Sequence, residues 1–561
     1  MDSQFPREKG GKDSTPQPRS LGTIQLLDGA TNERILVPKP SDDPNDPLNW
    51  SDARKRYIFG LSCTSIFLAH CLAVGPSVAL GPITAEFYGP ENVAANISTV
   101  SFLQTACSLM MGVGNLIWVP IAIKYGRRPT YVASFLIMTG CSVWCGAAKT
   151  FPSALAARIL LGTAIASPEV IAPLTLTDIF FLHQRGRVMV IYTCALSAGV
   201  GVGVVISGLI TMHHSWRMIY WVFTALIGVC TLLILFTFPE TNYNRQINVL
   251  TGEPVLAPNI NSDKSRTSDL KDERVENIET LSQPGFPPQR KTFVQDLKIF
   301  TTTYTNERLV DLVFRPIAAI VLPALLWATL VNTMTIGMIV VLSASFSSAF
   351  SEIYGFETWQ AGLTFIASIV GSLVGIFWGG HAGDWVADKL TLRNGGVRTP
   401  EMRLPAMAIS LVTGPLSCLL YGFGFGKKLH WMCATVGIGL VNFTIVQSNN
   451  IGLVYIIDSY RPIAGEVIIT QSVFKAIFGF LLSFYADLWI RRDGYITVFS
   501  ILAGVSAAVF LSTSIFYVWG DKLRRASWKW RWVTKFLHWN ADREVGASSE
   551  GTQLKEFSTV D

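Results

Sequence analysis

Two ionisable residues interrupt an otherwise apolar stretch of the sequence, LAARILLGTAIASPEV, from Leu155 to Val170. They are Arg158 and Glu169, which are eleven positions apart. In a helix this spacing is about three turns, so both side chains would lie on one face with about 16 Å of axial rise between them. That distance excludes a direct ion pair. We therefore predict that this face meets water or other polar groups and not lipid.

The two side chains are suited to different chemistry at membrane depth. Arg158 keeps its charge, because the pKa of a guanidinium stays above about 12, so it is a candidate for binding substrate or for holding an acidic group ionised. A buried carboxylate titrates closer to neutral pH than an exposed one, which makes Glu169 the candidate for proton coupling. In the structural alternative, Glu169 only neutralises a basic residue.

Further polar residues in apolar runs extend this candidate substrate and proton pathway. Gln471 and Lys475 are four residues apart and would share one helix face. The other candidates are Asn442, Asn449, Asn332 and His70. Taken singly, an Asn or Gln more often joins two helices than binds a ligand, and a lone His is more often a satisfied core residue. A lysine is the hardest of these to explain as packing, so Lys475 could supply a second charge that changes partners during transport.

The apolar runs around these residues are long enough to cross a bilayer. Of the 561 residues, 50% are hydrophobic and only 15% are charged, compared with about 25% charged in soluble proteins. About 20 apolar residues span a membrane as a helix, and twelve such runs occur: 57–79, 97–121, 130–148, 152–176, 188–210, 217–238, 314–343, 358–380, 403–425, 431–456, 464–487 and 495–518. We predict an all-α membrane protein with twelve transmembrane helices in two six-helix halves.

Polar segments divide the chain into five parts. These are a largely disordered N-terminal tail (1–56), a first six-helix half (57–238), a disordered linker (239–312), a second six-helix half (313–518) and a C-terminal tail (519–561). Lys and Arg favour the links on the side of both termini, so the positive-inside rule places the tails and the linker in the cytoplasm. Asn96 then begins a possible glycosylation sequon outside. The basic and aromatic segment 522–539 is predicted to lie along the inner leaflet.

Several classes of function are disfavoured by the same composition. The nine cysteines lie in apolar runs, without a CxxC pair or a His cluster, so neither a metal site nor a disulfide framework is indicated. The net charge of +6 is too small to suggest a nucleic-acid partner. The links carry no P-loop, no nucleophile–base set and no metal-ligand cluster. We therefore expect no cofactor, no ATP hydrolysis and no enzymatic activity.

Two similar links occupy equivalent positions in the two halves. KYGRRP (Lys124–Pro129) follows the second apolar run, and GGHAGDWVADKL (Gly379–Leu390) follows the eighth. In the first link, a glycine supplies a tight turn before two arginines that can hold helix ends. Either link alone is a weak signal. Two at corresponding positions indicate an internal duplication.

With these links the chain resembles the major facilitator superfamily of transporters, over about residues 40–525. KYGRRP resembles the family signature G-x-x-x-D-R-x-G-R-R, and LAARILLG resembles the motif that carries an arginine in the fourth helix. DPNDPLNWSDARK, DIFFLHQRGR, FPETNYNR and RNGGVRTPEMRL resemble a fungal branch of drug, toxin and polyamine-type carriers. By this resemblance the gating loops contain Gly126, Arg127, Arg128, Gly380 and Asp384.

The chain departs from the family pattern in the first link and in the fifth run. Val119 and Ile123 stand where the signature has Gly and Asp, whereas the second link keeps both residues. The resemblance therefore implies that Asp384 or other pairs carry the latch, and we expect that Asp384→Asn impairs transport and that Ile123→Asp does little harm. The fifth run resembles the antiporter motif, but Val204 replaces its proline and Ser207 one of its glycines.

The resemblance implies a secondary transporter that moves a small organic compound by alternating access, coupled to protons. The expected substrates are a drug, a toxin, a secondary metabolite or a polyamine-like cation. The expected partners are this compound, protons and the lipid bilayer, and the protein is expected to act as a monomer in the plasma membrane. The alternative is a nutrient sensor on the same scaffold that does not transport, although sensors of this kind usually carry a longer tail.

Overall fold

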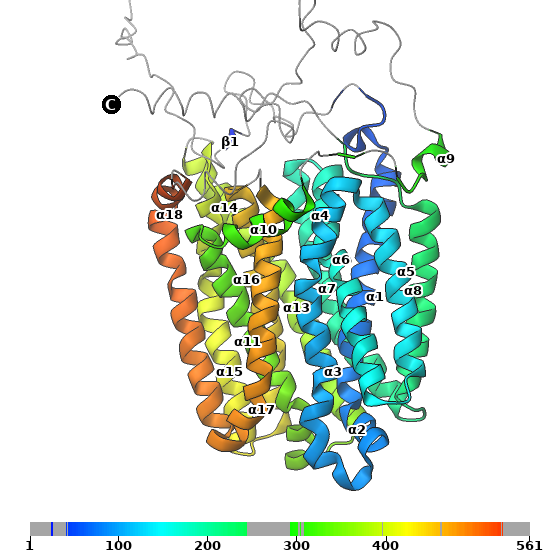
Figure 1. The fold of residues 1–561 in the computed structure, drawn as a ribbon. Coiled ribbons are helices and arrows are strands. Elements are labelled where there is room, and N and C mark those ends of the chain that lie inside the picture. Colours follow the sequence, from blue (N-terminus) through cyan, green and yellow to red (C-terminus); the bar gives the residue numbers. More distant parts are fainter. Residues whose placement is uncertain are drawn as a thin grey trace, which may run out of the picture.

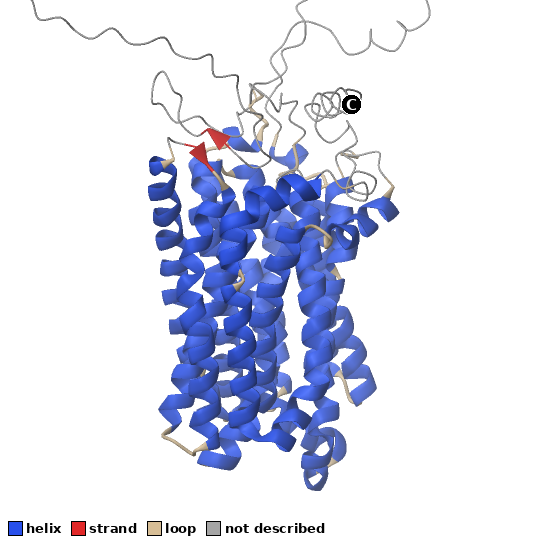
Figure 2. Cartoon of the chain, turned by 90° about the vertical axis from the view of Figure 1, so that its left-hand side faces the viewer, coloured by secondary structure: helices blue, strands red, loops and turns tan. Residues whose placement is uncertain are grey.

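Helices make up nearly all of the structure, a computed structural model that describes residues 24–25, 41, 43–243, 292–300, 303–304, 308–394, 397–460, 463–528 and 530 (Figure 2). The helices stand side by side in a bundle (Figure 1). Most of the predicted N-terminal tail, linker residues 244–291 and the aromatic tail segment beyond residue 530 lie outside the described residues. The predictions for those segments therefore stay predictions.

The first half follows the predicted apolar runs, with two breaks. Ser51 begins the first helix by accepting the backbone N–H of Arg54. The helices are α1 (Asp52–Val74), α2 (Leu80–Tyr88), α3 (Val93–Val113), α4 (Asn115–Tyr125), α5 (Arg127–Ala147), α6 (Phe151–Ile179), α7 (Leu182–Thr211) and α8 (Arg217–Thr237), with short 3-10 turns η1 (Pro47–Asn49), η2 (Gly75–Ala79) and η3 (Pro90–Asn92). The first span bends at η2, where Pro76 cannot donate a backbone hydrogen bond. The second span breaks at Gly114, between α3 and α4.

The second half follows a short helix, α9 (Phe293–Asp296), at the end of the linker. Its elements are α10 (Leu309–Ala319), α11 (Pro323–Tyr354), α12 (Thr358–Thr364), α13 (Ile366–Ile376), the π-helical turn η4 (Phe377–Ala382), α14 (Gly383–Arg393), the 3-10 segment η5 (Pro400–Met407), α15 (Ala408–Gly426), α16 (Trp431–Ser459), α17 (Ala464–Leu511) and α18 (Thr513–Trp528). Two strands of two residues each, β1 (Ile24–Gln25) and β2 (Val397–Arg398), pair in antiparallel fashion. They are the one departure from an all-helical description among the described residues.

Eleven stretches of the described chain are long and apolar enough to cross a membrane, and the last, Gly465–Ser527, is 63 residues long. This stretch reverses direction at Gly494, whose φ of 79° is left-handed and therefore suits glycine. Gly426 packs on Ile496 and Gly414 packs on Phe510. The part after Gly494 therefore runs antiparallel to α15, and the last stretch forms two spans. The twelve predicted spans are confirmed in this way.

The predicted seventh span, 314–343, was wrong at its beginning. Residues Leu309–Ala319 form the separate helix α10, and the span itself begins at Pro323 in α11. The apolar run continues through both helices, so composition alone did not mark the break. Figure 1 shows α10 lying across the bundle, not along it.

The described parts of the linker and the two tails adjoin one end of the bundle, which we call the linker end (Figure 1). The first five residues of the predicted disordered linker are packed there: Thr241 is fully buried, and Tyr243 donates a hydrogen bond to Asp43. On the other side of the linker, Asp296 forms an ion pair with Arg54. The last residues of the N-terminal tail and both described ends of the linker are therefore attached to the first half.

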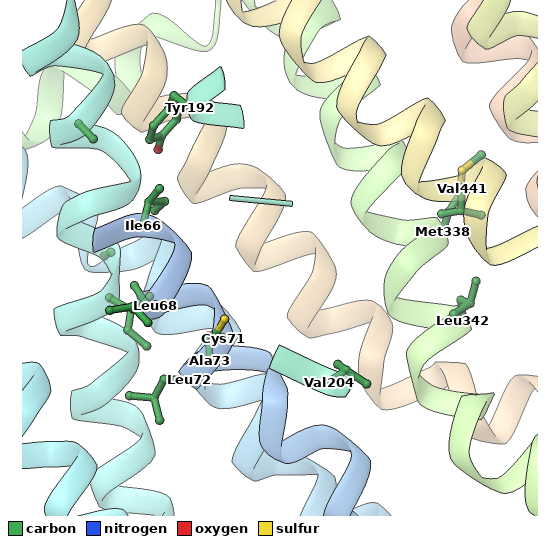
Figure 3. Close-up of a cluster of buried hydrophobic side chains, with 14 of the residues drawn as sticks. Ile66, Leu68, Cys71, Leu72, Ala73, Tyr192, Val204, Met338, Leu342 and Val441 are labelled. Atoms are coloured by element: carbon green, nitrogen blue, oxygen red, sulfur yellow. The ribbon is translucent and has the colours of Figure 1, made fainter. Parts of the chain in front are cut away.

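The two halves pack along two seams. In one seam, α3 and α4 contact α17, and in the other, α7 contacts α12 and α13. A Cβ atom on Gly112 would lie 2.7 Å from the carbonyl oxygen of Ser472, so this approach of α3 to α17 requires glycine. The inner apolar side chains form one large cluster (Figure 3), which includes Ile66, Leu72, Tyr192, Met338, Leu342 and Val441. Large apolar side chains of α8, such as Val229 and Leu232, are exposed on the outside, as expected of a surface that faces lipid.

Candidate functional site

A buried ion pair joins the two halves near the middle of the bundle. The Nζ atom of Lys475 in α17 lies 2.5 Å from Oε1 of Glu169 in α6. The Glu169 side chain is 8% exposed and the Lys475 side chain 21% exposed. Two helix residues that the sequence singled out separately are thus direct partners, although they are 306 positions apart. This contact satisfies the requirement that a charge at membrane depth has a counter-charge.

Residues of the first half surround the carboxylate of this pair. His70 in α1 is buried and close enough to interact electrostatically with both Glu169 and Lys475. Its Nδ1 atom lies 3.1 Å from the carbonyl oxygen of Ile66. The hydroxyl of Tyr192 in α7 donates a 2.7 Å hydrogen bond to the backbone carbonyl of Glu169. His70 therefore has a partner on its own helix and also adjoins the charged pair.

An apolar cluster, which we call the plug, lies between the ion pair and the linker end. It combines residues of α4 and α6 from the first half with residues of α16 and α17 from the second. Val119, Val170, Leu174, Ile468, Ile469 and Val473 are buried in it, and Leu116, Ile123, Leu453 and Ile457 pack against them. The two residues that depart from the family signature, Val119 and Ile123, are thus both part of the plug. The plug and the ion pair thus join the two halves on the side of the linker end.

Arg158 lies apart from this pair, with 1% of its surface exposed. Its Nε atom donates to the carbonyl of Leu103 at 3.1 Å, and its Nη2 atom donates to the side-chain oxygen of Gln104 at 2.5 Å. Within the described part of the chain, no Asp or Glu forms an ion pair with Arg158. The structure therefore does not bring Arg158 and Glu169 together around one polar site.

The remaining contacts of Arg158 explain why a guanidinium is buried here. It donates to the carbonyl oxygens of Leu72 at 3.2 Å and of Ala73 at 2.9 Å. In a regular helix the carbonyl of Leu72 would accept the N–H of residue 76, but Pro76 has none. Arg158 thus replaces a hydrogen bond that the bend in α1 has lost, and it ties α6 to α1.

The other predicted pathway residues form a polar patch in the second half, with one exception. Gln471 donates to the carbonyl of Ala328 at 3.2 Å, and Asn449 accepts from Thr335 at 3.4 Å. Asn332 is buried on the same face of α11, and its Oδ1 atom has no hydrogen-bond partner among the described residues. Asn442 instead donates to Ile438 of its own helix. Gln471, Asn332 and Asn449 are therefore neighbours. Gln471 also lies about one helical turn from Lys475 on α17.

The predicted gating arginines of the first half are held by two acidic residues that sequence analysis missed. Arg127 pairs with Asp178 at the end of α6, at 3.3 Å. The carboxylate of Glu240, just beyond α8, accepts the backbone N–H groups of Arg127 and Arg128, which open α5. Gly126 precedes them with a φ of 108°, and a side chain there would collide with Glu240. The string FPETNYNR contained Glu240, but nothing local in it indicated this contact.

The second half repeats this arrangement and adds the predicted latch. Arg403, just before α15, lies 3.9 Å from Asp458 at the end of α16, as Arg127 lies beside Asp178. Arg403 also pairs with Asp384 of α14 at 2.9 Å. Gly380, one turn before Asp384, packs on Val190 of α7 in the first half. The second link therefore adjoins the seam between the halves, and its acid has no counterpart at Ile123.

Asn96 lies at the end of the bundle opposite the linker end, in the first turns of α3. Its Nδ2 atom donates to the carbonyl of Asn92 at 3.1 Å. Glycosylation at this position stays a prediction.

Comparison with known proteins agrees with this architecture. A family model for the major facilitator superfamily matches residues 62–462. The chain is 25% identical to an uncharacterized MFS-type transporter of Schizosaccharomyces pombe, covering 88% of each protein. It is 24% identical to the efflux pump radE of Floropilus chiversii, covering 86% of this chain and 83% of that one.

A solved structure shows the same fold. The crystal structure of the human organic anion transporter MFSD10 superposes with a TM-score of 0.56 at 15% identity, over 82% of this chain and 99% of that one. The two six-helix halves, the repeated arginine–aspartate pairs and the family match lead to one conclusion. The protein belongs to the major facilitator superfamily and is a multi-pass membrane transporter.

Proposed function

We propose that this protein is a secondary active transporter that moves a small organic compound by alternating access and couples this movement to protons. The observation that carries the proposal is the ion pair between Glu169 and Lys475, because it is buried and its partners belong to different halves. The name of one relative, an efflux pump, supports transport across a membrane. The sequence motifs favour a drug, a toxin, a secondary metabolite or a polyamine-like cation.

Separation of the halves at the linker end must break this pair. Removing one partner from a buried ion pair costs about 3–5 kcal/mol, because an uncompensated charge is left behind. A proton on Glu169 removes the attraction before the halves move, so that Lys475 can turn to a different partner or to water. Release of the proton on the other side restores the pair. In this scheme Glu169 binds the proton, and its charge determines whether Lys475 of the second half stays paired with it.

The polar patch beside Lys475 is the proposed substrate contact. Gln471, Asn332 and Asn449 come from three helices of the second half, and the buried Oδ1 atom of Asn332 has no hydrogen-bond partner among the described residues. Amide side chains donate and accept hydrogen bonds, so they suit a neutral or cationic organic compound. The linker end is the proposed cytoplasmic end, since Lys and Arg favour the links on that side. The plasma membrane and a monomeric state stay predictions.

The test compares small molecules inside and outside cells that contain the wild-type protein, no protein, or the variant Glu169→Gln. We expect at least one organic compound to change its distribution with the wild-type protein only. In proteoliposomes that compound should accumulate when a pH gradient is imposed, and a protonophore should abolish the accumulation. Accumulation that persists without any proton gradient would contradict proton coupling. If no compound changes its distribution, the result would favour the alternative, a nutrient sensor that does not transport.

A further inference from the structure

Helix α10 (Leu309–Ala319) presents an uncovered apolar face outside the twelve spans. Val310 is 62% exposed, Phe314 63% and Ile317 45%. These positions are four and three residues apart, so they form one stripe along the helix. Leu312, Pro316 and Ala319, on the opposite side, are buried. The helix is therefore apolar on two faces, and the protein covers only one of them.

The covered face of α10 connects the two halves at the linker end. It packs against α4 of the first half and α17 of the second. The carbonyl oxygen of Pro316 accepts a 2.5 Å hydrogen bond from Thr470 of α17. Because α4 and α17 also supply Val119, Ile468 and Ile469 to the plug, α10 lies beside the plug. In the proposed alternating-access movement, opening of the linker end separates α4 from α17, and α10 then leaves one of them.

The uncovered face continues into the surface of the bundle that faces lipid. Val321, in the turn after α10, is 50% exposed, and Leu326 and Leu330 of the next span are 48% and 49% exposed. The latter two lie on the outside of a transmembrane helix. A helix that runs across the bundle with an apolar stripe at this level is suited to the boundary between headgroups and acyl chains.

We propose that α10 lies in the membrane leaflet at the linker end, with Val310, Phe314 and Ile317 among the lipid acyl chains. Since the same helix contacts both halves beside the plug, it connects the plug to that leaflet. Loss of contact with α4 or α17 during opening is then coupled to movement of α10 within the interface. The lipid contact of α10 does not depend on the proposed transport function, whereas its coupling to the plug rests on that function.

The contact is tested by footprinting the full-length protein in lipid nanodiscs, followed by peptide mass spectrometry. A photoactivated carbene reagent dissolved in the lipid should label Phe314 and Ile317 within about twofold of Leu326. Hydroxyl radicals generated in water should modify Phe314 at least about tenfold less than His214, an exposed residue at the opposite end. Radical modification of Phe314 equal to that of His214 would overturn the proposal. So would absence of both labels, which would mean that protein covers this face.

The coupling between α10 and the plug is tested by measuring hydrogen exchange of backbone amides in the same nanodiscs. Phe314→Asp should raise the exchange rate of backbone amides in α4 at least about fivefold, because the helix leaves the interface and releases α4. Asp311→Asn, at an exposed position on the same helix, is the control and should change the rate less than about twofold. Phe314→Ser is a milder variant, if the Asp variant fails to purify as one species. Rates for Phe314→Ser within about twofold of wild type would contradict the coupling.

Discussion

Lys475 and Glu169 are joined by a 2.5 Å ion pair between α17 and α6, on the side of the plug away from the linker end. The charges and the apolar contacts of the plug are thus adjacent, and α6 and α17 contribute to both. In the proposed mechanism, protonation of Glu169 weakens this closed arrangement.

Glu169→Gln should leave exchange intact and end active accumulation. The amide keeps the shape of the side chain and a hydrogen bond to Lys475, but it cannot take up or release a proton. In proteoliposomes we expect counterflow within about twofold of wild type and loss of accumulation driven by a pH gradient. Survival of gradient-driven accumulation would assign the coupling to another group.

Lys475→Met is the matched test of the structural alternative for Glu169. It leaves the carboxylate buried without its partner, which costs about 3–5 kcal/mol. The double variant Glu169→Gln/Lys475→Met removes both charges and should regain most of the lost thermal stability. If Glu169→Gln alone is as unstable as Lys475→Met, the pair serves folding and not coupling.

Arg158→Met should destabilise the protein through the bend in α1. The guanidinium hydrogen bonds to Leu72 and Ala73 are of the charge-assisted type, worth about 1.5–3 kcal/mol each. In a Pro76→Ala background the backbone N–H of residue 76 can bond to Leu72, so Arg158→Met should cost less there. Thermal unfolding of the four variants measures this coupling. Unchanged stability with loss of transport would instead assign Arg158 to the substrate.

Ile123→Asp should be harmful, contrary to the expectation from the family signature. Ile123 packs against the plug, and its Cδ1 atom lies within 3.9 Å of a Cβ atom built on Gly465 of the other half. A carboxylate there would lie against buried apolar side chains and would lose its hydration. We expect transport to fall at least about tenfold, whereas Ile123→Leu should keep at least half of the wild-type rate. Wild-type transport by Ile123→Asp would show that the plug does not govern closure.

Asp384→Asn should weaken the latch in the second half. Arg403 then loses the 2.9 Å ion pair and keeps the longer contact with Asp458, at 3.9 Å. We expect transport to fall several-fold, with Asp388→Asn, at an exposed position on the same helix, as the control. Initial rates of uptake measure the difference. Equal rates for both variants and wild type would locate the latch elsewhere.

The sequence by itself determined the helical membrane fold, because the property that matters is local. A bilayer requires about 20 apolar residues per span, and each run meets this requirement independently of the others. The twelve spans and the repeated links at Gly126 and Gly380 were therefore predictable. The beginning of the seventh span was not, since apolar residues continue from α10 into α11 and the change of direction between them depends on packing.

The tertiary structure decided which polar groups meet. Glu169 and Lys475 were each notable as charges in apolar runs, but their contact spans 306 positions and depends on how two halves dock. Asp178 and Glu240 drew no attention, because acidic residues at helix ends are ordinary until they face Arg127 and Arg128. Arg158 donates to backbone carbonyls and not to an acid, because Pro76 leaves the carbonyl of Leu72 without its N–H donor. Helix periodicity places a side chain on a face, and only packing determines what that face meets.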